Sequence, residues 1–260
     1  MSFEADTIDR YTPIGFIFGA RLSFSSVSKL TIGTIGEISC LRDSTNAYNL
    51  LFTGLLNADM AITGAGGLRS GLTEAADTWY AILLIGDTSD ANTPKGFIDI
   101  SHTTPILPSG YDVFRRVGWA RNNSSSDFLN FSQTGSRNDR RYWYYENAAD
   151  VRPLQNGNAT SFTAVDCSSF IPPTSRRIAM RSAFSSGSGG GAATASAAIL
   201  RPTGITMTKP VWRNQPSVHS TVKASAYIEM PCDSSQSIDY SVTASANKLT
   251  IIIMGYNDEV

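Results

Sequence analysis

Apolar residues in this chain recur with a period of two or in short unbroken runs, and no long stretch repeats them at the helical period of 3.6. Turns rich in Ser, Gly and Asn separate the runs at a spacing of about 8–12 residues, which is typical of a β-sandwich. We therefore predict an all-β fold, an antiparallel, jelly-roll-like sandwich with long loops. The best helix candidates are one or two turns near 74–77 and 146–150.

The longest apolar run, 79–85, is expected to form the centre of the core. It consists of aromatic, branched and leucine residues, ends at Gly86, and is too short for a typical helix. The segments 96–100 and 111–119 follow as a short strand and a second apolar run. Because its apolar residues are unbroken, we predict a strand at 79–85 that is buried on both faces. Burying each large apolar side chain would contribute ~1.5–3 kcal/mol, which favours this strand as the centre of the core.

Other strands are predicted from the same alternation of apolar and polar residues. They are expected at 15–24, 29–32, 37–41, 48–53, 60–63, 128–133, 162–167, 176–184, 222–230, 237–244 and 249–256. The glycine-rich segment 64–71 lacks the Lys-Ser/Thr ending of a phosphate-binding loop, so we interpret it as a tight glycine turn.

The chain is long enough for one sizeable β domain, which we place at 16–260. Residues 1–15 are polar and are expected to form an extended arm, either an anchor to a neighbouring molecule or a frayed terminus. A Gly/Ser/Ala-rich segment at about 185–198 is either a domain boundary or a long loop, and the loop is preferred.

Composition narrows the function classes. Charged residues make up 17% of the chain, below the ~25% usual in globular proteins. The formal net charge is −1, which argues against a general role on nucleic acid or at a membrane surface. Residues 1–12 carry several charges, and the chain has no apolar run of membrane-spanning length. We therefore expect neither a signal peptide nor membrane insertion.

The residues that could carry chemistry are few and scattered. Cys40, Cys167 and Cys232 lack metal-ligand spacing, and we expect reduced thiols, the alternative being one disulfide with one cysteine left over. His102 and His219 lie near no recognisable nucleophile motif. We predict no catalytic, cofactor-binding or metal-binding residues, and no enzyme activity.

The segment 137–145 is the most unusual in composition, because three arginines stand beside a row of four aromatic residues. It suits a strand with one face in the core, a subunit interface, a sugar-stacking surface or single-stranded nucleic acid, and the first of these is preferred. We treat it as the candidate interface or ligand surface, formed by Arg137, Arg140, Arg141, Tyr142, Trp143, Tyr144 and Tyr145.

Two parts of the chain carry a family resemblance. The first holds the motifs DTWYAILLIGDTS, LPSGYDVFRRVGWARNNSS and FLNFSQTG, and the second holds IDYSV and LTIIIMGY. Together they lie in residues 60–135 and 225–256, about half the chain. This pattern resembles structural proteins of tailed bacteriophages and prophages, namely tail-fibre, head-fibre or capsid-decorating proteins.

The resemblance implies a non-enzymatic virion component that assembles with itself, as a homotrimer, and with other capsid or tail proteins. Such a protein would be made in the host cytoplasm, released by lysis and located in the virion, with adhesion to a host-surface glycan as a further role. Neither a cofactor nor nucleic acid is expected as a partner. The alternative function is a carbohydrate-binding module that uses the aromatic row at 142–145.

Overall fold

The computed structural model describes residues 20–41, 47–89, 92–136, 139–145, 151–185, 197–206, 212–214 and 223–259. All regular elements among them are β-strands, which confirms the predicted all-β class. The helix candidate 74–77 is not helical: residues 76–77 form a turn in which Asp77 takes a positive φ of 53°, and the hydroxyl of Tyr80 binds both backbone groups of Ala75. The second helix candidate, 146–150, and the arm 1–15 lie outside the described residues.

The chain forms two compact units, Met1–Tyr145 and Glu146–Glu259. This division differs from the single domain that we predicted over 16–260. Each unit buries its own apolar residues, for example Ile82 in the first and Ile251 in the second. The Gly/Ser/Ala-rich segment lies inside the second unit, since the strands that flank it end at Ser185 and begin at Ala198.

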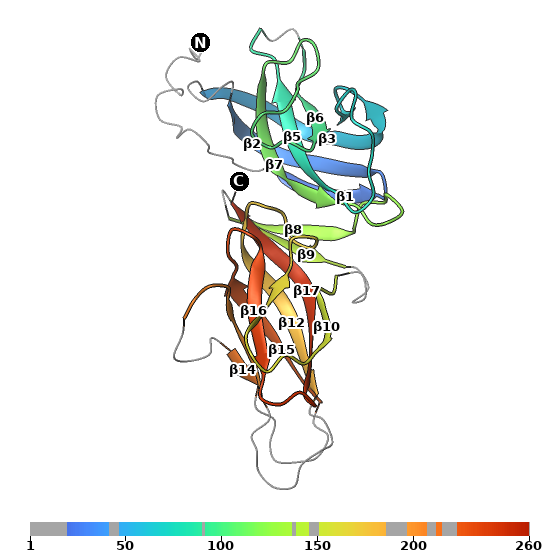
Figure 1. Cartoon of the computed structure of the whole chain (residues 1–260). Coiled ribbons are helices and arrows are strands. Elements are labelled where there is room, and N and C mark those ends of the chain that lie inside the picture. The colour runs from blue at the N-terminus through green and yellow to red at the C-terminus, as the bar shows by residue number, and fades with distance from the viewer. Residues whose placement is uncertain are drawn as a thin grey trace. The chain divides into compact units, whose positions relative to one another are not determined.

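Among the described residues of the first unit, nine strands form one curled, mostly antiparallel sheet (Figure 1). They are β1 (Arg21–Ser26), β2 (Lys29–Leu41), β3 (Ala47–Thr63), β4 (Gly67–Leu68), β5 (Trp79–Gly86), β6 (Lys95–Asp99), β7 (Val113–Arg121), β8 (Phe131–Ser136) and β9 (Asp139–Tyr144). Their order is β9-β8-β1-β2-β3-β4-β6-β5-β7. β7 also pairs with β2 at Leu41 and Phe114, so the sheet curls round on itself.

Strand β5 is buried on both faces, as predicted. Its residues from Tyr80 to Ile85 are all inaccessible to solvent. Leu83 and Ile85 belong to a cluster with Phe97 and Trp119, against which loop residues pack. Ile82 and Leu84 occupy the alternate positions, so they point to the opposite face.

Two predicted strand pairs are in fact single long strands. β2 runs unbroken where we expected strands at 29–32 and 37–41, and β3 runs through 48–53 and 60–63. The two strands pair continuously from Lys29 and Asp59 to Leu41 and Ala47. Glycines had suggested breaks, but Gly54 accommodates a φ of 127° within the ladder instead.

The predicted glycine turn after β3 is confirmed. Gly66 has a φ of 95°, and a Cβ on Gly67 would lie 2.6 Å from the carbonyl oxygen of Asp59. Only glycine fits this close approach of two backbone segments. The turn brings the short strand β4 beside β3 in parallel.

In the part of the second unit that the structure describes, the strands form two sheets of four strands each. The strands are β10 (Leu154–Gly157), β11 (Thr163–Asp166), β12 (Ser175–Ser185), β13 (Ala198–Pro202), β14 (Trp212–Asn214), β15 (Lys223–Pro231), β16 (Ser237–Val242) and β17 (Lys248–Glu259). One sheet has the order β15-β12-β17-β10, and the other has the order β11-β16-β13-β14. Every pairing within these sheets is antiparallel.

This connectivity is the jelly roll. Numbered along the unit, the strands lie in the orders 1-8-3-6 and 2-7-4-5, which is the arrangement of two interlocked Greek keys. The inward faces meet where the hydroxyl of Tyr240 on β16 accepts a hydrogen bond from the Ala159 backbone N–H (3.3 Å) beyond β10. A Cβ on Gly157 of β10 would lie 2.7 Å from the same hydroxyl oxygen.

Three strands of the second unit, β10, β13 and β14, were not predicted from the sequence.

Candidate functional site

Strand β9 divides the predicted row 137–145 between two faces. Tyr142, Tyr144 and Arg140 are buried, and Arg140 is only 2% exposed. Arg141 and Trp143 occupy the alternate positions and are half-buried. The row is therefore not one continuous surface, and its first member, Arg137, lies outside the described residues.

The buried half of the row forms a polar cluster around Gln133 of β8. The Gln133 side-chain oxygen accepts hydrogen bonds from the Leu22 backbone N–H (2.7 Å) and from Arg140 Nη1 (3.1 Å). Its amide nitrogen donates to the Tyr142 hydroxyl (2.5 Å), and Arg140 also donates to the carbonyl oxygen of Ala20. These bonds fix β1, β8 and β9 to one another, so Arg140 and Tyr142 have a structural role.

The outward half of the row ends in an exposed tyrosine. Tyr145 is 66% exposed, and its hydroxyl bonds to Ser132 Oγ (3.1 Å). Of the residues predicted to form an interface or ligand surface, Arg141, Trp143 and Tyr145 are those on the outward face that are at least partly accessible in the described part of the chain. An aromatic and an arginine on one face can stack on a flat partner.

The carboxylate of Asp87 helps to hold the turn after β5. Asp87 accepts hydrogen bonds from the side chain and backbone N–H of Ser89 and from the side chain and backbone N–H of Asn92. These bonds, the Ser89 side chain first, lower the pKa of Asp87 to about 2. The carboxylate is fully engaged in holding its turn.

A second polar cluster ties the segment before β5 to β7. Arg121 forms an ion pair with Asp77 (2.9 Å). The Asn122 side chain accepts from the Thr78 backbone N–H (2.7 Å) and donates to the Ala75 carbonyl (2.7 Å). The Asn122 side chain completes backbone hydrogen bonds of this segment, and the ion pair joins the segment to β7, so these groups have a structural role.

The histidines are not brought into a catalytic arrangement within the described residues. The His102 ring lies 5.2 Å from the Trp119 ring, and the Arg116 guanidinium lies 5.6 Å from the same ring. His219 lies outside the described residues. In the described part of the chain, no three His, Cys, Asp or Glu side chains are placed to hold a metal ion.

Cys167 and Cys232 are free thiols, in agreement with the predicted reduced state. Burial raises the pKa of both, that of Cys232 to about 11. The side chain of Cys40 is outside the described set.

The described residues contain no helix that is long and apolar enough to cross a membrane.

The structure shows two further features that the sequence analysis had not singled out, a cluster of three residues and an exposed tyrosine. On the second unit, the Arg201 guanidinium lies 3.6 Å from the Phe162 ring centroid and pairs with Asp239 (3.0 Å). No sequence signal links these distant positions. Tyr227 on β15 is also exposed, and the period-two pattern of that strand could have revealed it.

Comparisons with known proteins add little. No protein-family profile and no curated protein matches the chain. Among solved structures, a crystal structure of a Bacillus thuringiensis Cry1Da tryptic core variant aligns with 92% of this chain, at a TM-score of 0.23 and 8% sequence identity. The aligned region covers about half (51%) of the length of the Cry1Da chain. A likeness at this score carries no conclusion about fold or function.

Proposed function

We propose that the chain is a non-enzymatic structural component of a tailed-phage virion: a decoration, head-fibre or tail-fibre protein that assembles as a homotrimer. The observation that carries the proposal is the strand order of the second unit, because eight-stranded jelly rolls build viral capsid and lectin domains. Since a fold alone does not define a function, the proposal also rests on the resemblance at 60–135 and 225–256.

The resembling segments coincide with the buried framework of both units. In the first unit they include β5–β7, and in the second they include most of β15 and β17 together with β16. Ile82, Ile98 and Val117 are completely buried in the first set, as are Ile238, Leu249 and Ile251 in the second. Residues that fix a rigid body are those expected in a protein that works by its shape.

The polar clusters support a role without catalysis. Asp87 holds a turn, Asp77 and Arg121 hold a loop, and Gln133 holds three strands together. In the proposed function, one surface docks on other capsid or tail proteins and another binds a host-surface glycan. The protein acts in the virion, without a cofactor, a nucleic acid or membrane insertion.

Size-exclusion chromatography with light scattering tests the assembly step directly. Three chains of 28.0 kDa give a complex of about 84 kDa, and the proposal expects this mass over a wide range of concentrations. A stable 28.0-kDa monomer at all concentrations would contradict the trimeric virion protein and favour a carbohydrate-binding module.

A further inference from the structure

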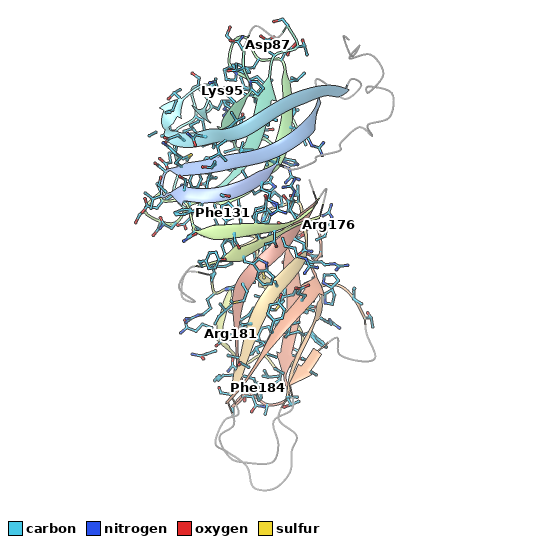
Figure 2. The ribbon with its side chains drawn as sticks, turned by 180° about the vertical axis from the view of Figure 1, so that it is seen from behind. Asp87, Lys95, Phe131, Arg176, Arg181 and Phe184 are labelled. Carbon is cyan, nitrogen blue, oxygen red and sulfur yellow. The ribbon has the colours of Figure 1, made fainter. Side chains whose placement is uncertain are left out.

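The outer face of the β15-β12-β17 sheet carries an exposed aromatic residue and charged residues in register. Arg181 of β12 pairs with Tyr227 of β15 on one side and with Ile252 of β17 on the other. Arg181 and Tyr227 are exposed, whereas Ile252 is buried, so the open part of this face lies over β12 and β15. Figure 2 labels Arg181 on this strand, together with the inward-facing, buried Phe184.

Small residues form the floor beside these side chains. Ala179 pairs with Glu229 one row away, and Ala183 pairs with Ser225 on the other side of the Arg181 row. Ala179 is only 5% exposed, while Tyr227 is 53% exposed. On the outer face of β12, the two neighbours of Arg181 are therefore alanines. The Tyr227 ring stands beside this low, flat part of the sheet surface.

The tyrosine is held in place by its neighbour on the same strand. The Tyr227 hydroxyl donates a hydrogen bond to the Glu229 carboxylate (2.6 Å). This bond restricts the side chain of Tyr227, so its ring would lose less entropy when a ligand stacks on it. Arg177 is also exposed on the outer face of β12, where it pairs with Pro231 beyond the Ala179–Glu229 pair, so this face carries two guanidinium groups and one carboxylate.

We propose that Arg177, Arg181, Tyr227 and Glu229 form a binding surface for an acidic saccharide. One sugar ring stacks on Tyr227 over the alanine floor, and its carboxylate accepts paired hydrogen bonds from the guanidinium of Arg181. Glu229 accepts hydrogen bonds from sugar hydroxyl groups. The two arginines outweigh the single carboxylate, so the charge of the surface complements that of an anionic ligand.

The same observations disfavour a subunit contact at this position. The centre of a protein–protein interface is depleted of charged residues, but here the exposed charged residues Arg181 and Glu229 are immediate neighbours of the exposed Tyr227. A polysaccharide with many hydroxyl groups can satisfy both charges without removing them fully from water. The inference deepens the proposed function, because it rests on the adhesion step and identifies the surface that performs it.

Calorimetric titration of the full chain tests the inference, with a galacturonic-acid tetrasaccharide as the probe and a neutral galactose tetrasaccharide as its control. We expect saturable binding that is tighter for the acidic probe and that weakens as salt rises from about 50 to about 500 mM. Tyr227→Ala should weaken binding at least about tenfold. Arg181→Gln should remove the preference for the acidic probe.

Ile106→Ala is the control, since this large side chain is similarly exposed but lies in the first unit and is not one of the candidate binding residues. It should bind as the wild type does. An equal loss of binding in Ile106→Ala and Tyr227→Ala would overturn the assignment, as would the absence of binding to the probe and to every acidic member of a glycan array.

Light scattering on the same samples separates the two proposals. If the wild type is a trimer that binds no acidic saccharide, the inference fails and the proposed assembly stands. If Tyr227→Ala breaks the trimer, the face is a subunit contact and the inference is overturned. A wild-type monomer that binds the probe would support the saccharide surface and contradict the assembly.

Discussion

Gly118 of β7 and Tyr142 of β9 fit each other so closely that no side chain can be added to the glycine. A Cβ built on Gly118 would overlap the Tyr142 hydroxyl oxygen and would lie 2.9 Å from Cδ1 of Leu22. The same hydroxyl accepts the hydrogen bond from Gln133. The glycine therefore makes room for the buried half of the segment whose arginines and aromatic residues suggested a ligand surface.

Gly118→Ala is expected to destabilise the protein by about 1–3 kcal/mol, because the new methyl group overpacks this contact. Combining it with Tyr142→Phe should cost less than the sum of the two single changes, since one overlap is then removed. Chemical denaturation of the four proteins measures this coupling. Gly33→Ala is the control, because its Cβ would meet only the Leu55 side chain, at 3.3 Å. Strict additivity of the two changes would contradict the proposed fit.

Gln133→Leu should destabilise the first unit by at least about 2 kcal/mol, since it leaves several buried polar groups without this partner. The affected groups include the Leu22 backbone N–H, the Arg140 guanidinium and the Tyr142 hydroxyl. Thr134→Ala, at the exposed neighbouring position of β8, should have little effect on the unfolding free energy. Equal midpoints for these two variants would show that the cluster contributes nothing.

Asp87 should make stability depend on pH in the acid range. Its pKa is lowered in the folded state, so the ionised carboxylate stabilises the fold above the ordinary value of 3.8. That contribution should be lost as the pH falls from about 4 to about 2. Urea unfolding across this range should show the stability difference between wild type and Asp87→Asn shrinking as the pH falls.

Ser89→Ala is a matched test of the cause. It removes the hydrogen bond that lowers the Asp87 pKa most, so the contribution of the carboxylate to stability should be smaller, and its loss on acidification should be complete at a higher pH. An unchanged pH profile in this variant would contradict the hydrogen bond as the source of the shift.

Cys167 and Cys232 should resist alkylation in the native protein. Because burial raises their pKa values, the reactive thiolate form is scarce, at about one part in a thousand for Cys232 at pH 8. Peptide mapping after iodoacetamide treatment should find both unmodified when folded and both modified when unfolded. Faster labelling of Cys167 than of the less buried Cys232 would contradict this account.

The sequence predicted the strands whose side chains alternate or are uniformly apolar, and missed those defined only by pairing. The core strand 79–85 was predicted correctly because a continuous run of large apolar residues is typical of a strand that is buried on both faces. β10, with the sequence LQNG, shows no such pattern, and it is recognised only by its pairing with β17. β13 begins at Ala198, at the end of a low-complexity segment that had been interpreted as a loop.

The candidate site was predictable in part. Alternation along 137–145 allowed one covered face, and the burial of Tyr142 and Tyr144 agrees with that preferred interpretation. The cluster behind it was beyond sequence reasoning, since Gln133 and Leu22 are 111 residues apart. The two-unit division was likewise hidden, because two small β domains and one large one share the same local pattern.

The central claim is that this chain acts by assembly on a virus particle, and quantitative mass spectrometry of purified particles tests it most directly. The account predicts that the chain is present in fixed copy number, in a multiple of three per particle, alongside the capsid and tail proteins. Particles that lack the chain entirely, with the protein found only free in the lysate, would contradict the account.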